Sequence, residues 1–150
     1  MREILFRGKS NCSYGKVKKG DWLYSMTISR HCYDDKEITS YYIGSGINTI
    51  DGKTLGQYTG LTDKNGKKIF EGDVVKNDWC FMCGNSVIKF GQYKTLDMGN
   101  EYQQGHLGFY LEHIHEADKR SVRKDIMYFA NNCEIVGNIY DNPELLKGGE

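Results

Sequence analysis

The chain has 150 residues, which is the size of one domain, or of one domain with a small appendage. Its 20 Lys and Arg residues balance its 20 Asp and Glu residues. No overall field therefore draws it to nucleic acid or to an anionic membrane, and only a local patch can do so. The balanced charge and the 11 tyrosines exclude the composition of a disordered chain.

The chain begins MREILFRGKS, which lacks the apolar stretch of a signal peptide, and no run of about 18 apolar residues occurs. An odd number of cysteines at irregular spacing is typical of reduced thiols and not of a disulfide framework. These cysteines are Cys12, Cys32, Cys80, Cys83 and Cys133. We therefore expect a soluble cytoplasmic protein that makes no membrane contact.

Strands are predicted in the first third of the chain. Glycine is spread throughout and Pro143 is the single proline, so turns depend on Gly, Asn and Asp, as in β-rich proteins. Short aromatic and β-branched runs at residues 4–6, 22–28 and 40–44 predict strands. Residues 45–54 are rich in Gly, Asn and Asp without a periodic apolar face. We therefore predict an N-terminal β-rich portion that spans residues 1–54.

The stretch GQYTGLTDKNGKKIFEGDVVK, at residues 56–76, is the most tightly specified segment of the chain. The pair Asn65-Gly66 is well suited to positive φ at both central positions of a type I′ turn, so it predicts a hairpin tip. Gly72-Asp73 predicts a tight bend that starts a new strand over residues 73–77. We interpret the stretch as architecture rather than as a catalytic loop.

Three further runs, at residues 86–90, 106–114 and 134–140, predict strands in the second half of the chain. Between them, Val122, Ile126 and Phe129 repeat at helical spacing, which predicts one short helix over residues 118–130. Several short strands at hairpin spacing favour a mainly β protein, α+β at most, with antiparallel hairpins in a small barrel or sandwich.

Five segments carry a specific pattern in order along the chain. They are REILFRGK (residues 2–9), GQYTGLTDKNGKKIFEGDVVK (56–76), VIKFG (87–91), RKDIMYF (123–129) and EIVGNIYDNPELL (134–146). Together they resemble the signature of the YopX family of phage and prophage proteins over nearly the whole chain. Residues 12–48 and the insert NDWCFMCGN at residues 77–85 depart from the usual pattern.

The resemblance implies a protein of a phage or integrated prophage, made in the cytosol of a bacterial host. It implies a mainly β fold, with an SH3-like barrel and a C-terminal arm over residues 55–150, and a homo-oligomer. It implies no reaction, so no catalytic residue and no cofactor carries over. The structural residues of the signature are Gly56, Tyr58, Gly60, Asp63, Asn65, Gly66, Gly72, Asp73, Gly137, Asn138 and Pro143.

Cys80 and Cys83 have the two-residue gap that lets two thiolates bind one metal or form a small redox loop. A structural zinc needs four ligands, and the sequence has no second pair of this kind. Ordinary thiols in a loop are the alternative, which we prefer. We therefore expect less than one zinc per chain in protein purified without added metal.

His113 and His115 are two residues apart, so on a strand both imidazoles lie on one face and can share a metal. Glu112 and Glu116 are adjacent and can orient a ring. The alternative, which we prefer, is that the histidines lie on a solvated face while Leu111 and Ile114 help to form the core.

A basic surface is possible if the predicted helix packs near the predicted hairpin tip. Tyr58, Tyr93 and Tyr110 would add stacking faces of the kind that β-barrels use to hold single-stranded nucleic acid. Lysines at a hairpin tip more often serve solubility and edge protection. The candidate nucleic-acid-binding residues are Lys64, Lys67, Lys68, Arg120, Arg123 and Lys124.

Phosphate-binding glycine loops, a nucleophile elbow and a complete calcium loop are absent from the sequence. The sequence therefore favours a non-enzymatic binding module that acts on a host or phage macromolecule. The alternatives are a nucleic-acid-binding β-barrel module and a small metal-dependent enzyme that uses His113 and His115.

The tail EIVGNIYDNPELLKGGE places Leu145 and Leu146 on a short arm after Pro143, which ends the last strand. Such an arm docks either on its own chain or in a groove of a neighbouring copy. We expect the neighbour, because self-association is a common way for a small domain to bury apolar surface.

Overall fold

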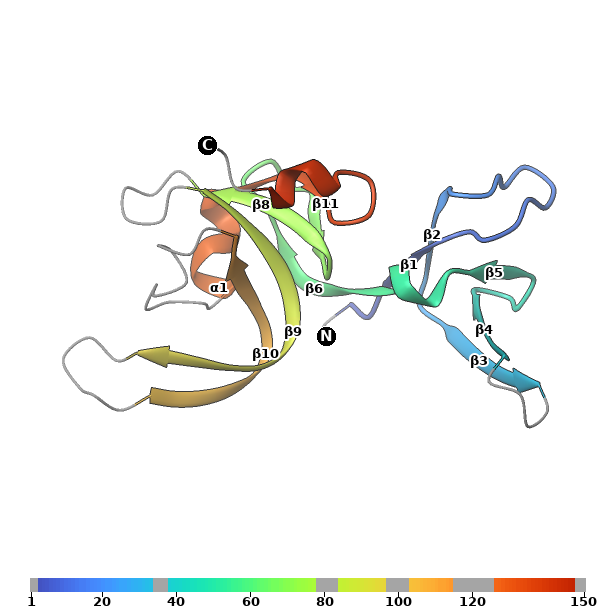
Figure 1. Cartoon of the computed structure of the whole chain (residues 1–150), viewed down its shortest axis with the longest axis horizontal. Coiled ribbons are helices and arrows are strands. Elements are labelled where there is room, and N and C mark those ends of the chain that lie inside the picture. The colour runs from blue at the N-terminus through green and yellow to red at the C-terminus, as the bar shows by residue number, and fades with distance from the viewer. Residues whose placement is uncertain (1–2, 34–37, 78–83, 97–102, 115–125, 148–150) are drawn as a thin grey trace. The chain divides into compact units, whose positions relative to one another are not determined.

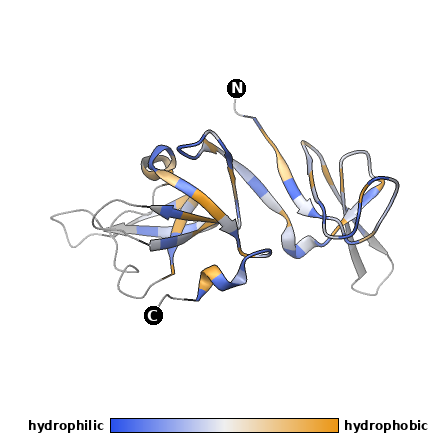
Figure 2. Cartoon of the chain, turned by 90° about the horizontal axis from the view of Figure 1, so that it is seen from above, coloured by the Kyte–Doolittle hydropathy of each residue, from blue (hydrophilic) through white to orange (hydrophobic). Residues whose placement is uncertain are grey.

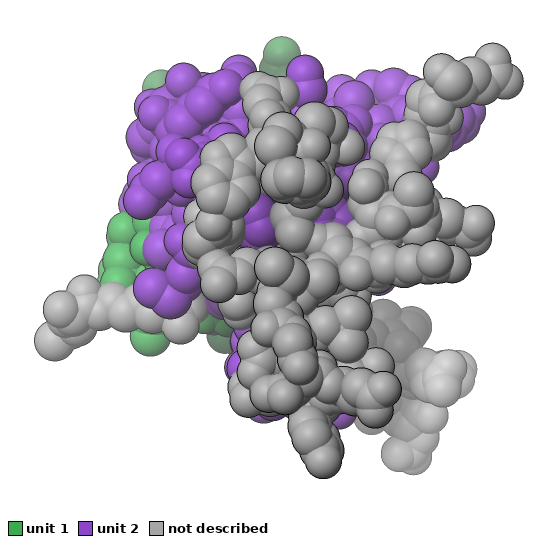
Figure 3. Space-filling model, turned by 90° about the vertical axis from the view of Figure 1, so that its left-hand side faces the viewer, with its two compact units in different colours: residues 1–60 green, residues 61–150 purple. Residues whose placement is uncertain are grey.

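The structure is a computed structural model that describes residues 3–33, 38–77, 84–96, 103–114 and 126–147. It is mainly β, and its sheets are built from antiparallel pairs, so the predicted fold class is confirmed (Figure 1). The chain divides into two compact units, residues 1–60 (unit 1) and 61–150 (unit 2) (Figure 3). The division along the chain follows Gly60, whereas the sequence suggested a division after residue 54.

Unit 1 is made of short strands and one 3-10 helix. Its elements are β1 (Phe6–Lys9), β2 (Trp22–Ser25), β3 (Ile28–Tyr33), β4 (Ile38–Ile43), β5 (Asn48–Ile50) and η1 (Gly52–Thr54). β1 pairs with β2 on one side and with β6 on the other, while β3, β4 and β5 form a separate sheet in that order. Residues 45–54, predicted to be irregular, therefore contribute a strand and a capped turn.

The predicted strand over residues 22–28 is two strands in two sheets. The Ser25 hydroxyl accepts a hydrogen bond from the Thr27 main-chain N–H at 3.1 Å, and the Thr27 hydroxyl donates to the Gly44 carbonyl at 3.1 Å. These side-chain bonds to the backbone make a corner, because they replace the ladder bonds that a continuous strand would use.

Unit 2 contains the longer strands. The elements from residue 56 onward are β6 (Gly56–Thr62), which continues from unit 1, β7 (Lys68–Phe70), β8 (Asp73–Asn77), β9 (Gly84–Leu96), β10 (Gln103–His113), α1 (Ile126–Phe129), η3 (Ala130–Asn132), β11 (Cys133–Asn138) and η4 (Pro143–Leu146). The main sheet has the order β10-β9-β8-β11. β9 extends well beyond its predicted bounds of 86–90, and β10 begins three residues before its predicted start and ends one residue before its predicted end. The two strands curve together as one long hairpin (Figure 1).

The core of unit 2 lies between this sheet, the β6–β7 hairpin and α1. Its buried residues are Ile69, Val75, Ile88, Leu111, Ile126, Phe129, Ala130 and Cys133. Hydrophobic residues concentrate on these strands and on the helix in Figure 2.

The described part of the predicted helix is the single turn of α1, followed by η3, which ends at Asn132. Its predicted start lies outside the described residues. No helix of the described chain is long and apolar enough to cross a membrane.

The β6–β7 turn has the predicted glycine but not the predicted turn type. Gly66 has φ +77°, and its N–H donates to the Asp63 carbonyl at 2.9 Å, while the Asp63 N–H donates to Lys67. The turn is therefore centred on Lys64-Asn65, and Gly66 follows it as a bulge, which is the common three-residue hairpin loop. The prediction of a type I′ turn is therefore wrong. The Asp63 carbonyl accepts the hydrogen bond that closes the turn, and this bond places Lys64 and Asn65, rather than Asn65 and Gly66, at the two central positions.

The bend at Gly72-Asp73 is confirmed, and β8 has the predicted bounds. Gly72 has φ +82°, where a side chain would be strained and would approach Tyr140 to 3.1 Å. Its N–H donates to the Ile88 carbonyl and its carbonyl accepts from Ile139, both at 2.9 Å. The glycine thus connects β9 to the residues that follow β11.

The C-terminal arm docks on its own chain, contrary to the expectation that it reaches a neighbour. Leu145 lies over β11, where a Cβ added to Gly137 would come within 2.7 Å of its Cδ1. The Leu145 carbonyl also accepts a hydrogen bond from the Asn85 side chain at 3.4 Å. Gly137 has no side chain, so it leaves the space that Leu145 occupies, and this leucine is half-buried against its own chain.

Candidate functional site

The most specific part of the sequence pattern holds the hairpin tip to β11. The Asp63 carboxylate is buried and accepts three main-chain hydrogen bonds, from Asn65 and Lys67 at 2.9 Å and from Ile135 at 3.1 Å. Burial by itself raises the pKa of Asp63, but these N–H groups outweigh it and hold the pKa below its ordinary value. The Lys64 N–H donates to the Cys133 carbonyl at 3.0 Å. This arrangement is structural, as the sequence suggested.

The predicted nucleic-acid patch is not assembled by the described residues. The Lys64 ammonium pairs with Glu134 at 2.7 Å, so its charge is offset locally. Tyr58 is only 6% exposed, which makes the prediction that it offers a stacking face wrong. It is buried because it belongs to β6, which continues the sheet of β1. Lys67 is exposed and Lys68 is half-buried, while Arg120, Arg123 and Lys124 lie outside the described residues.

His113 faces the core and not the solvent, which corrects the preferred interpretation of this strand. It is 6% exposed, and its Nδ1 shares a 2.8 Å hydrogen bond with the hydroxyl of Ser86, its cross-strand neighbour. His113 lies two residues from Leu111, so both side chains enter the same buried face. Within the described ranges no three His, Cys, Asp or Glu residues are close enough to hold a metal. His115, Cys80 and Cys83 lie outside those ranges.

The described thiols differ in their surroundings. Cys133 is buried and its Sγ donates to the Ala130 carbonyl at 3.4 Å. Burial raises the pKa of Cys133 to about 11, so it stays protonated and behaves as a small core residue. Cys12 lies 3.2 Å from the Thr49 hydroxyl, and this hydrogen bond lowers the pKa of its thiol. Neither thiol belongs to a catalytic group of described residues.

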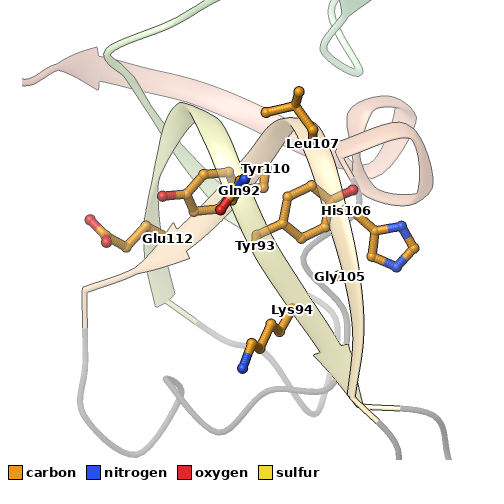
Figure 4. A pocket seen from close by; sticks show the side chains of 8 residues that line it. All are labelled: Gln92, Tyr93, Lys94, Gly105, His106, Leu107, Tyr110 and Glu112. Atoms are coloured by element: carbon orange, nitrogen blue, oxygen red, sulfur yellow. The ribbon is translucent and has the colours of Figure 1, made fainter.

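The side chains that the fold brings together most conspicuously are three rings on the β9–β10 hairpin. Tyr93 stacks on Tyr110 with ring centroids 5.2 Å apart and on His106 at the same distance, with interplanar angles of 23° and 26°. Tyr93 and His106 are cross-strand partners, and Tyr110 lies diagonally across the Gly91 and Gly108 pair. We call Tyr110, Tyr93 and His106 the aromatic ladder (Figure 4).

The aromatic ladder lines an open groove of about 760 Å³. Lys94 and Glu112 also line it, and Glu112 forms an ion pair with Lys89, so the charges of the groove are nearly balanced. A Cβ added at Gly105 or Gly108 would meet nothing within 4 Å, which shows that the backbone of β10 is open at these points. The groove therefore offers flat rings, an open backbone and a few paired charges.

The sequence named Tyr93 and Tyr110 as stacking faces but missed His106. The sequence did contain a signal for this contact. Gly91, Gly105 and Gly108 lie among the aromatic residues of two adjacent strands, and a glycine leaves room for a neighbouring ring. Finding the contact needed the register, in which His106 faces Tyr93 and Gly91 faces Gly108.

A comparison with curated proteins finds no match. Among solved structures, the crystal structure of protein EF1440 from Enterococcus faecalis is similar to this chain at 19% identity and a TM-score of 0.47, covering 98% of this chain and 100% of that one. The model of the family described as YopX protein matches residues 5–147. Because that match covers nearly the whole chain, the protein belongs to the YopX family.

Proposed function

We propose that this YopX-family chain is a non-enzymatic binding module of a phage or prophage, and that it holds a host or phage protein in the groove of the aromatic ladder. The observation that carries the proposal is the stacking of Tyr110, Tyr93 and His106 along an open groove. Rigid aromatic side chains provide large contact area at a low entropic cost, and for this reason tyrosine is enriched at protein interfaces.

The charge of unit 2 favours a protein over a nucleic acid in this groove. Residues 61–150 contain eleven Lys and Arg against fourteen Asp and Glu. The groove is lined by one lysine, Lys94, and by Glu112, which forms an ion pair with Lys89 of the adjacent strand. A polyanion would be repelled by the excess of acids, whereas a protein segment with mixed polar and apolar side chains matches a groove of this composition.

The buried dyad of Ser86 and His113 supports a non-enzymatic role for that pair. Its 2.8 Å hydrogen bond has the length expected between a serine nucleophile and its base. Ser86 is 2% exposed and His113 is 6% exposed, so a substrate could not reach either group. The hydrogen bond satisfies two polar groups inside the sheet, and we assign it to stability.

The experiment is a capture of proteins from a nuclease-treated lysate of the bacterial host. We expect Tyr93→Ala and Tyr110→Ala to reduce the captured partner by about tenfold, which is typical of the loss of an interface anchor. Tyr14→Ala, at an exposed tyrosine of unit 1, is the matched control and should capture as much as the wild type. Circular dichroism of each variant verifies the fold. Equal capture by all four proteins, or capture by none, would refute the proposal.

The SH3-like barrel and the homo-oligomer stay predictions. The barrel is supported by the hydrogen bonds of the β6–β7 tip to β11, which bring the hairpin to the edge of the main sheet. Light scattering on the intact chain measures the oligomer directly.

A further inference from the structure

Unit 1 has an excess of basic over acidic residues. Residues 1–60 contain nine Lys and Arg against six Asp and Glu. Within them, the β1–β2 hairpin over residues 6–25 has five basic residues and a single acid, Asp21. The Asp21 carboxylate accepts the Lys18 main-chain N–H at 2.8 Å, so it helps to close the loop. A chain of zero net charge therefore carries one locally basic hairpin.

The loop of this hairpin is held by hydrogen bonds. Tyr14 and Val17 exchange two main-chain hydrogen bonds of 3.0 Å, and the Lys19 N–H donates to the Ser13 hydroxyl at 3.0 Å. The lysines of the loop are exposed, and they are Lys16, Lys18 and Lys19. Because the loop is fixed, their positive charges are presented together at one end of the hairpin.

An aromatic face adjoins these charges. Lys9 faces Trp22 and Arg7 faces Tyr24 across the β1–β2 ladder, so the four side chains lie on one face of the pair. The Arg7 guanidinium lies 4.6 Å and the Lys9 ammonium 5.7 Å from the centre of the Trp22 ring. These cation–π contacts fix the position of Lys9. Tyr24 is 55% exposed and presents an accessible ring.

A cavity of about 470 Å³ connects the two features. Lys9 and Lys19 line it together with Ser10 and Gly20, and Asp51 is the acid of its wall. The Asp51 side chain accepts the Lys53 N–H at 3.0 Å, as the cap of η1. Two basic residues, Lys9 and Lys19, thus contribute to the lining of a space that is large enough for a phosphate group.

We infer that the β1–β2 hairpin binds single-stranded nucleic acid, with phosphates on the loop lysines and in the cavity of Lys9 and Lys19, and an unpaired base stacked on Tyr24. Ammonium groups that follow a backbone and an exposed ring that takes a base are the two elements of sequence-tolerant single-strand binding. The bases of a duplex are paired and stacked on one another, so they cannot use the ring of Tyr24. This site is separate from the aromatic ladder and does not depend on it.

Fluorescence anisotropy of the intact chain with labelled oligo(dT) and oligo(U) of about 16 nucleotides tests the inference, because single-strand sites extend to about this length. We expect binding of at least one of the two, with a slope of log affinity against log salt of about −2, as three phosphate contacts produce. The two oligonucleotides distinguish DNA from RNA as the ligand, and binding of either supports the site.

Substitutions localise the binding. The triple variant Lys16→Gln, Lys18→Gln, Lys19→Gln should bind about tenfold more weakly and with a flatter salt slope. The matched control Lys67→Gln, Lys76→Gln, Lys147→Gln removes the same charge from exposed lysines of unit 2 and should bind as the wild type does. Tyr24→Leu should weaken binding about fivefold or more through lost stacking.

Three results would overturn the inference. One is an absence of binding to both oligonucleotides at low salt. Another is an equal loss of affinity in the two triple variants, which would show that the charge effect is not local. The last is full competition by inorganic polyphosphate together with wild-type affinity of Tyr24→Leu, which would show a general polyanion site without base stacking.

Discussion

The two units are stabilised in different ways. Unit 2 has a contiguous cluster of eight buried residues, to which two long strands, the hairpin and α1 all contribute. In unit 1 the buried aliphatic residues of the described chain are Ile43 and Ile50, and they share its interior with the polar residues Arg7, Ser10 and Thr54. Unit 1 therefore depends more on hydrogen bonds and ring contacts, which contribute less per group than buried apolar surface.

The difference also separates the two proposed roles. Unit 2 combines an apolar core with an excess of acids and an aromatic groove, which favours a protein partner. Unit 1 combines few buried aliphatic residues with an excess of bases and a basic hairpin, which favours a nucleic acid. A small unit with a limited core is expected to be the less stable of the two.

The largest expected effect is the loss of the Phe129 side chain from the core of unit 2. Phe129 is 2% exposed, so Phe129→Ala should lower the free energy of unfolding by about 3–5 kcal/mol, through lost burial and a new cavity. Urea unfolding followed by circular dichroism measures it. Met127, in the same helix, is 76% exposed, and Met127→Ala should change stability by less than about 0.5 kcal/mol. Similar losses in both variants would show that α1 does not seal this core.

The second prediction concerns Asp63, whose carboxylate serves three N–H groups in unit 2. Asp63→Ala should cost about 2–4 kcal/mol, since it leaves buried donors without their acceptor. Asp51 is the matched residue of unit 1, an exposed cap that serves Lys53, and Asp51→Ala should cost about 1 kcal/mol or less. Equal costs would mean that the hairpin tip is no more tightly held than a surface turn.

Asp63 also predicts a pH dependence with a definite sign. Its pKa in the folded state is lowered, so its contribution to stability is present above the unfolded pKa of about 3.9 and is lost as the pH falls through the folded value. The wild type should therefore lose more stability than Asp63→Asn when the pH is lowered below about 4. Urea midpoints measured at several pH values give the comparison, and parallel curves for the two proteins would contradict it.

How far the sequence could predict the structure depends on the range of the interactions. β8 has its predicted bounds because Gly72-Asp73 is a local signal. The aromatic ladder could not be placed, since Tyr93 and Tyr110 meet only through the register of two long strands. The same holds for the basic hairpin, whose lysines are visible in KVKK but whose aromatic face requires Lys9 to pair with Trp22. His113 was misplaced because its polarity was given more weight than its spacing from Leu111.

A smaller effect is expected at Gly66, which has φ +77° at the hairpin tip of unit 2. Gly66→Val should destabilise by about 1–2 kcal/mol, because a β-branched residue is strained in the left-handed region. A Cβ there would meet nothing within 4 Å, so the cost is one of backbone conformation alone. Lys67→Ala, at the exposed neighbour, should change stability little. Thermal melting of both variants decides whether the tip conformation contributes to stability, and equal, negligible shifts would contradict it.

The smallest expected effect distinguishes the two leucines of the C-terminal arm. Leu145 fills the space over Gly137 and is tied to Asn85 of β9, whereas Leu146 is 38% exposed. Leu145→Ala should therefore cost about 1 kcal/mol and Leu146→Ala less than about 0.5 kcal/mol, because Leu145 is half-buried whereas Leu146 is exposed. Deletion from Pro143 onward should then lower stability and leave the molecular mass of the assembly unchanged in light scattering. A truncated chain of lower oligomeric order and undiminished stability would instead show that the arm belongs to an interface between copies. The comparison thus tests whether unit 2 closes its own core or needs a partner to do so.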